Sequence, residues 1–149
     1  MQNVFSEENI KIISQIDNWQ KAVEIACQPL LEEKKITQKY VTNIIKSVKK
    51  YGPYMVLTDY FALMHAKPGE GVNQLAMSLL VVKEPIDLEG KKVKIFLILA
   101  CPDSKSHIKT LKEVAGVLMD QCNFELILKG TKSQIIDLFQ KKEMDGGKK

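Results

Sequence analysis

The segment Val93 to Ala100, VKIFLILA, has Lys94 as its only polar residue, and this run constrains the fold more than any other part of the sequence. A strand with one solvent-exposed face alternates apolar and polar residues, because successive side chains point to opposite faces of a sheet. A continuous apolar run predicts a strand that is buried on both faces. We therefore expect a central strand with helices packed on either side of it.

Two amphipathic segments near the start of the chain predict helices. The first runs from Asp17 to about Glu33, where apolar residues recur near a 3.6-residue period and Asp17 and Gln20 have the spacing of a capping box. The second begins after Thr37, a candidate N-cap, and ends before Gly52 and Pro53.

Short apolar segments separated by turn residues predict strands in the middle of the chain. They are 54–57, 61–64, 75–82 and 93–100, with Pro85 and Gly90 among the residues expected to separate them. After them we expect a helix capped by Ser104 or Ser106, a last short strand from Phe124 to Leu128, and a final helix. Thr131 and Gln134 would cap that final helix. This order predicts an α/β fold, a three-layer sandwich whose mixed central β-sheet is flanked by helices on both faces.

Length and composition are those of one soluble domain. We expect a single domain over residues 1–149, with an ordered core at about 5–142 and a polar tail at 143–149. No apolar run approaches the roughly 20 residues that a membrane span needs, and the first residues lack the pattern of a signal peptide. A cytoplasmic location without membrane insertion fits these features.

The three cysteines and the charged residues exclude several functions. Cys27, Cys101 and Cys122 have no C-x-x-C spacing, which argues against a disulfide framework and a zinc site. Every basic residue is a lysine, and the net charge is only +4. Base reading relies on the arginine fork, and nucleic-acid binding usually shows a clustered basic face, so nucleic acid is not an expected partner.

The two histidines each follow a predicted strand. His65 ends the segment FALMH, and His107 follows ILACPDSKS. Ligands of open α/β sheets gather beyond the carboxyl ends of the strands, so the two imidazoles share one cleft if their strands are neighbours. A neutral imidazole is a nucleophile, and His107 would lie in the first turn of a helix, where anions are favoured. Position alone favours two unrelated histidines over a shared functional cleft.

Other polar and apolar residues near these histidines have ordinary interpretations. Asp103 and Glu70 could orient an imidazole, although solvated loop carboxylates are the commoner case. The remaining expectations are packing roles for Trp19, Tyr54, Cys27 and Cys101, core positions for Met55, Met64 and Met77, and an exposed apolar rim around His65 that includes Phe61.

Residues 52–88, GPYMVLTDYFALMHAKPGEGVNQLAMSLLVVKEPIDL, resemble the phosphorylation-site region of the type 2 enzyme IIA domains of the bacterial phosphoenolpyruvate-dependent sugar phosphotransferase system. This is the mannitol, fructose and ascorbate kind. The chain is most similar to the ascorbate-type branch, through Gly52-Pro53-Tyr54 and the segment WQKAV at 19–23. The resemblance extends from about Asn18 through His107 and its helix.

The resemblance implies an activity and a set of site residues. In the family, a histidine accepts phosphate from phospho-HPr and donates it to a cysteine of enzyme IIB, which serves a membrane enzyme IIC. His65, within MHAKP at 64–68, matches that phosphoryl acceptor, with attachment through Nε2. His107, within Ser106-His107, matches a second histidine that orients or stabilises the phosphoryl group. Lys67 and Ser106 are candidate phosphate-binding residues, and no metal or cofactor is implied.

Two substitutions depart from the family pattern. Met64 stands where proline is common, and Lys67 stands where arginine is often found, so we expect a less restrained backbone before His65 and weaker bidentate phosphate contact. The nucleophile itself is retained.

Several alternatives stay open at this point. The chain could instead be a regulatory module whose phosphorylation state controls a transcription factor or transporter, or a relative that keeps the fold for binding alone. The intact His65 and His107 argue against the last of these. The resemblance also allows a homodimer.

Overall fold

A five-stranded mixed sheet with helices on both faces forms the protein, as a computed structural model shows for residues 5–147, of which the backbone alone is described at 141–147. The sheet order is β1-β4-β5-β3-β2. The strands are β1 (Ile10–Ile13), β2 (Val56–Thr58), β3 (Tyr60–Met64), β4 (Ala76–Leu88) and β5 (Lys91–Ala100). The helices are η1 (Glu7–Asn9, 3-10), α1 (Trp19–Glu32), α2 (Gln38–Tyr51), α3 (Ser104–Leu118), α4 (Gln121–Lys129) and α5 (Lys132–Gly147).

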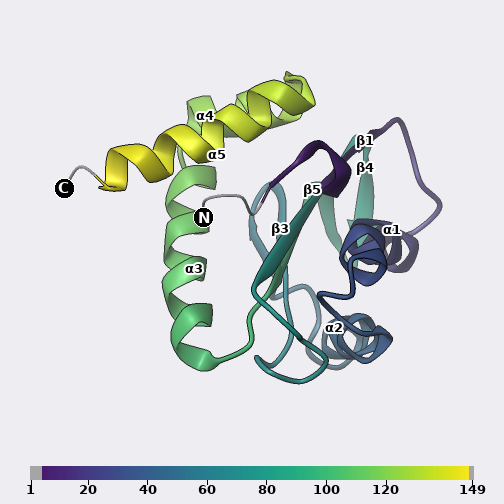
Figure 1. Ribbon diagram of the computed structural model, residues 1–149. Helices are drawn as coiled ribbons and strands as arrows, with labels where there is room; N and C mark the ends of the chain where they lie inside the picture. The colour runs from purple at the N-terminus through teal and green to yellow at the C-terminus, as the bar shows by residue number, and fades with distance from the viewer. Residues whose placement is uncertain (1–4, 148–149) are drawn as a thin grey trace.

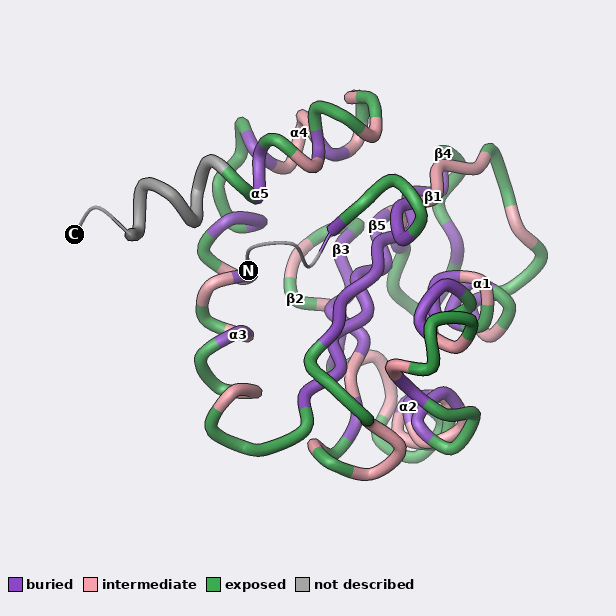
Figure 2. The backbone as a smooth tube through the Cα atoms, viewed as in Figure 1, coloured by how far each residue is buried: buried purple, intermediate pink, exposed green. Residues whose placement is uncertain are grey.

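The apolar run identified in the sequence is the central strand β5. Its last six residues are buried, and it lies between β4 and β3 with helices on both sides (Figures 1 and 2). One core cluster joins the sheet to α1 and α2, and the other joins it to α3, α4 and α5. Residues of β5 alternate between the two clusters, with Phe96 and Ile98 in the first and Ile95 and Leu97 in the second. The predicted three-layer α/β sandwich is confirmed.

The strand directions place two strand ends side by side. β3 is parallel to β5, and their register runs from Tyr60 opposite Val93 to Met64 opposite Ile98. β4 is antiparallel to β5, and β1 is parallel to β4. The carboxyl ends of β3 and β5 therefore meet at one edge of the sheet, where the chain leaves for its loops.

Two predictions about the helices are wrong. Asn18, not Asp17, caps α1 by accepting from the Lys21 amide at 2.9 Å, which lets Trp19 point into the core. Residues 124–128 are helical within α4, because Asp120 caps the Cys122 and Asn123 amides. A short apolar run alone does not distinguish a strand from a helix.

Pro85 does not separate two strands but lies inside β4. The pairing of β1 with β4 ends at Ile13 opposite Val82, and the β4–β5 register breaks between Val81 and Ile86. Proline is tolerated there because β4 at this point extends beyond the end of β1. The lack of an amide hydrogen in proline therefore removes no hydrogen bond to a strand on that side. The short strand β1 was not among the predicted elements.

The end of the chain is more regular than expected. Thr131 and Gln134 form the predicted capping box, since each backbone amide donates to the other side chain. The helix that they begin continues to Gly147, through most of the segment expected to be a polar tail. Within residues 5–147, no helix is long and apolar enough to cross a membrane.

Candidate functional site

The two histidines lie together at the edge where β3 and β5 end. His65 directly follows β3, and His107 lies in the fourth position of α3, which β5 leads into. The centres of the two imidazole rings are 5.4 Å apart, with their planes inclined by 52°. The expected proximity of the two imidazoles is confirmed, because parallel pairing of β3 with β5 supplies the neighbouring strands that it required.

A backbone carbonyl orients His65. Its Nδ1 lies 2.8 Å from the carbonyl oxygen of Leu63, a group that can only accept, so Nδ1 carries the proton. The other ring nitrogen, Nε2, then holds the lone pair. The expected orienting carboxylates have other contacts: Asp103 caps α3, and Glu70 forms ion pairs with lysines.

The surroundings of both imidazoles favour the neutral form. Burial lowers the pKa of His65 below its ordinary value, and the hydrogen bond to Leu63 opposes this only in part. Burial also lowers the pKa of His107, and the neighbouring His65 ring lowers it further. A neutral ring keeps its nucleophilic lone pair at physiological pH.

The start of α3 is capped by Asp103 rather than by a serine. The Asp103 carboxylate accepts from the Ser106 amide at 2.8 Å, and the Ser106 hydroxyl donates to the Asp103 carbonyl oxygen at 3.2 Å. The His107 amide also donates to that carbonyl oxygen, at 3.1 Å. Both donors of Ser106 are therefore engaged within the cap. The prediction that Ser104 or Ser106 caps this helix is wrong, because Asp103 is the N-cap.

His107 has one polar atom that the fold leaves unused. Its Nδ1 is buried and has no hydrogen-bond partner among the residues that the structure describes. An unsatisfied buried polar atom costs about 1–3 kcal/mol. A bound group that offers this nitrogen a partner would recover that cost.

Lys67 lies in the exposed loop after His65. Its Nζ is 3.4 Å from the Glu70 carboxylate, which also faces Lys39 Nζ at 3.8 Å. A hollow of about 260 Å³ begins at Ala66 and Lys67 and continues along α2 past Lys46 and Lys50. The loop after His65 and the neighbouring face of α2 thus carry several exposed positive charges, all of them lysines.

The loop after His65 is fastened to the core by its backbone. The Gly69 amide donates to the Cys101 carbonyl oxygen at 3.0 Å, and the Thr37 amide donates to the Gly71 carbonyl oxygen at 2.9 Å. Gly71 has φ +78°, and a Cβ there would lie 2.8 Å from the Tyr40 nitrogen. The amide of Gly69 is thereby used by the fold and is not free to bind a phosphate.

Two aromatic residues exchange the roles expected of them. Tyr54, expected in the core, is 48% exposed and meets the His65 ring edge-on, with 6.2 Å between ring centres. Phe61, expected on an exposed rim, is fully buried. The side chains of β3 point alternately into the two helical layers, and Phe61 packs in the layer of α3, α4 and α5. Trp19, Met55, Met64 and Met77 are buried as predicted.

The sequence interpretation missed Tyr40 and the Leu63 carbonyl. Tyr40 looks like any other apolar-stripe residue of α2, and a main-chain oxygen leaves no signal in the side chains. Cys101 is buried as expected, and burial raises the pKa of its thiol to about 11, so it is no rival nucleophile.

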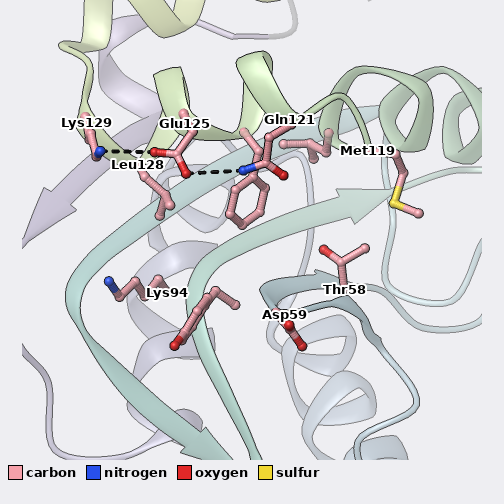
Figure 3. Close-up of a pocket in the computed structure, with 11 residues that line it drawn as sticks. Thr58, Asp59, Lys94, Met119, Gln121, Glu125, Leu128 and Lys129 are labelled. Atoms are coloured by element: carbon pink, nitrogen blue, oxygen red, sulfur yellow. Dashed lines mark hydrogen bonds and ion pairs between the residues drawn. The ribbon is translucent and has the colours of Figure 1, made fainter.

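A second hollow, of about 540 Å³, lies at the opposite end of β3. Tyr60, Met119 and Phe124 line it, and Glu125 is paired there with Lys129 and Gln121 (Figure 3). It contains neither histidine, so it is separate from the candidate site. Among the described residues, no group of three or more His, Cys, Asp or Glu side chains could hold a metal ion.

Comparison with known proteins decides the family. Residues 3–142 match the family "Phosphoenolpyruvate-dependent sugar phosphotransferase system, EIIA 2", which is nearly the whole chain. The chain belongs to this family. It is 25% identical to the ascorbate-specific phosphotransferase system EIIA component of Escherichia coli strain K12 over 139 residues, which cover 90% of each chain.

Solved enzyme IIA structures share the fold. The mannitol-specific cryptic phosphotransferase enzyme IIA of Escherichia coli is similar with a TM-score of 0.85 and 26% identity, over 93% of this chain and 97% of that one. The mannitol enzyme IIA solved in complex with phosphorylated enzyme IIB, also from Escherichia coli, has a TM-score of 0.79 and 15% identity, over 91% and 96%. The latter likeness concerns the fold alone. This chain is therefore an enzyme IIA component of a sugar phosphotransferase system, by family membership.

Proposed function

We propose that the chain is a cytoplasmic phosphocarrier that takes a phosphoryl group onto Nε2 of His65 from phospho-HPr and passes it to a cysteine of enzyme IIB. The observation that carries this proposal is the hydrogen bond between His65 Nδ1 and the Leu63 carbonyl oxygen. It fixes the tautomer whose Nε2 has a lone pair, beside a second imidazole.

The proposed transfer exchanges one bond to phosphorus for another. The Nε2 lone pair of His65 attacks phosphorus, the bond between phosphorus and the donor imidazole nitrogen breaks, and that nitrogen keeps the electron pair. In the second step a thiolate of enzyme IIB attacks, and Nε2 recovers its pair. Positive charge develops on the His65 ring in between, and the Leu63 carbonyl stabilises it at Nδ1.

His107 would act on the transferring group rather than as an acceptor. Its ring is close enough to face a phosphoryl group on His65, and its buried Nδ1 has no partner among the described residues. An N–H donor near the phosphoryl oxygens would stabilise the charge that they carry during transfer.

Lys67 and Ser106 are weaker candidates for phosphate contact. Lys67 is exposed and would reach a phosphoryl group only by leaving Glu70, an exposed pair whose separation costs little. Ser106 would have to release its bonds to Asp103. We place Lys67 ahead of Ser106 for this reason.

The exposed apolar residues around the site suit a docking partner. Tyr54 meets the His65 ring, Tyr51 meets Tyr54, and Ile108 directly follows His107 in α3. All three are between 48% and 64% exposed. One structural relative was solved in complex with phosphorylated enzyme IIB, and one sequence relative is the ascorbate-specific EIIA component of Escherichia coli. We extend both to this chain: an enzyme IIB as acceptor, a membrane enzyme IIC beyond it, and ascorbate as the sugar class.

Intact-mass spectrometry after incubation with phosphoenolpyruvate, enzyme I and HPr tests the proposal. The wild-type chain should gain one phosphoryl group, His65→Ala should gain none, and addition of the cognate enzyme IIB should discharge it. An unmodified wild-type chain, or a phosphorylated His65→Ala chain, would contradict it. Phosphorylation without transfer to any enzyme IIB would favour the regulatory alternative.

A further inference from the structure

Tyr40 of α2 reaches through the core to the histidine site. It is fully buried, and its hydroxyl makes two hydrogen bonds to main-chain groups. The hydroxyl accepts from the Ala66 amide at 3.1 Å and donates to the Leu99 carbonyl oxygen. Burial excludes water from these hydrogen bonds. Burial also raises the pKa of Tyr40, so the hydroxyl stays protonated and can donate and accept at the same time.

The two partners of this hydroxyl belong to the two histidine segments. Ala66 directly follows His65. Leu99 is the last residue but one of β5, the strand that leads into α3 and His107. One side chain from a third element therefore joins the segments whose side chains meet 5.4 Å apart, ring centre to ring centre.

With this bond, His65 is restrained on both sides. The Leu63 carbonyl oxygen, two residues before His65, holds the imidazole ring through Nδ1. The Tyr40 hydroxyl holds the backbone amide of Ala66, the next residue. Without the hydroxyl, the Ala66 amide would have no hydrogen-bond partner among the residues that the structure describes, and the backbone at His65 could rotate. This restraint matters more here because Met64, not proline, precedes His65.

We propose that Tyr40 is a positioning residue for phosphoryl transfer, because its hydroxyl fixes the His65 backbone relative to β5 and thereby sets the separation and tilt of the two imidazoles. The inference rests on the proposed function of His65. A role in packing alone would need only the ring, which phenylalanine supplies. Burial of the hydroxyl costs free energy, which its two hydrogen bonds offset.

The first test compares Tyr40→Phe with the matched control Ser78→Ala. Ser78 also has a buried hydroxyl that donates to a main-chain oxygen, that of Ala26, a bond that involves neither histidine segment. In single-turnover phosphorylation by phospho-HPr, Tyr40→Phe should lower the maximal rate by about tenfold to a hundredfold. The HPr concentration at half-maximal rate should not change, since the docking surface is intact. Ser78→Ala should keep the wild-type rate.

A second readout follows the His65 ring itself. In nitrogen-15 spectra of the unphosphorylated protein, wild type and Ser78→Ala should show the Nδ1–H tautomer of His65, and Tyr40→Phe should show a mixture of tautomers. In the wild type, the Ala66 amide should exchange slowly with solvent, a measurement that needs no variant to fold.

The outcomes separate the two proposals. A rate loss no larger than that of Ser78→Ala, an unchanged tautomer ratio, or an Ala66 amide that exchanges as fast as an exposed loop amide would each overturn the role of Tyr40. A wild-type chain that HPr never phosphorylates would overturn the proposed function instead, and the spectra and exchange rates would still decide whether Tyr40 positions His65.

Discussion

Tyr54 covers one side of His65: the two rings meet nearly perpendicular, at 84°, with 6.2 Å between their centres. Tyr54 is only half-buried, so it forms both a wall of the site and part of the outer surface. Since burial is the main cause of the lowered His65 pKa, this wall contributes to keeping the imidazole neutral.

Replacement of Tyr54 by alanine should therefore raise the His65 pKa. We expect the pKa to rise toward its ordinary value, because water then reaches the ring and favours its charged form. A pH titration of the His65 ring by NMR measures this. Tyr60→Ala, at the other end of β3, is the control and should leave the titration unchanged; an unchanged titration in Tyr54→Ala would show that other groups exclude water from His65.

Replacement of His107 by alanine should slow phosphorylation of His65 without abolishing it. The variant loses a polar group near the transferring phosphoryl oxygens but retains the nucleophile, so we expect a loss of about a hundredfold in rate. Quenched-flow mass spectrometry with phospho-HPr measures it. Lys109→Ala, an exposed change on the same helix, should have a much smaller effect. A full loss of phosphate acceptance in His107→Ala, or an unchanged rate, would contradict this supporting role.

The stability of the protein should fall as the solution is acidified through pH 6.5. Both histidine pKa values are lower in the folded state than in the unfolded chain, so the unfolded chain binds more protons below about pH 6.5. The free energy of unfolding then rises with pH in that window and levels off above it. Urea titrations between pH 5 and pH 8 measure this slope, which should be much smaller in His65→Gln/His107→Gln. An equal slope in that double variant would assign the effect to other groups.

Gly71→Ala should destabilise the protein more than Gly90→Ala. Both glycines have positive φ, +78° and +104°, so both substitutions introduce backbone strain of about 1–3 kcal/mol. A Cβ at Gly71 would also lie 2.8 Å from the Tyr40 nitrogen, whereas one at Gly90 would meet open space. Thermal unfolding should show a lower Tm for Gly71→Ala than for Gly90→Ala. Gly71→Ala should also be phosphorylated more slowly, because the new Cβ displaces the backbone of Tyr40. Equal Tm values would mean that the loop moves aside without cost.

The sequence by itself determined the layers of this protein. The apolar run of β5 required a strand covered on both faces, and helical periodicity supplied α1, α2 and α3 as covers. These are local or short-range patterns, in which burial and periodicity are read directly from residue type. Resemblance, rather than periodicity, singled out His65 as the phosphoryl acceptor.

The tertiary structure decided how the site is built. The parallel register of β3 with β5 brought His65 to His107, and contacts distant in sequence brought the Tyr40 hydroxyl to Ala66. The Leu63 carbonyl that sets the His65 tautomer is a main-chain group, which every residue has and no pattern marks. Short apolar segments such as 124–128 were decided in the same way, since caps and packing partners, not their own composition, made them helical.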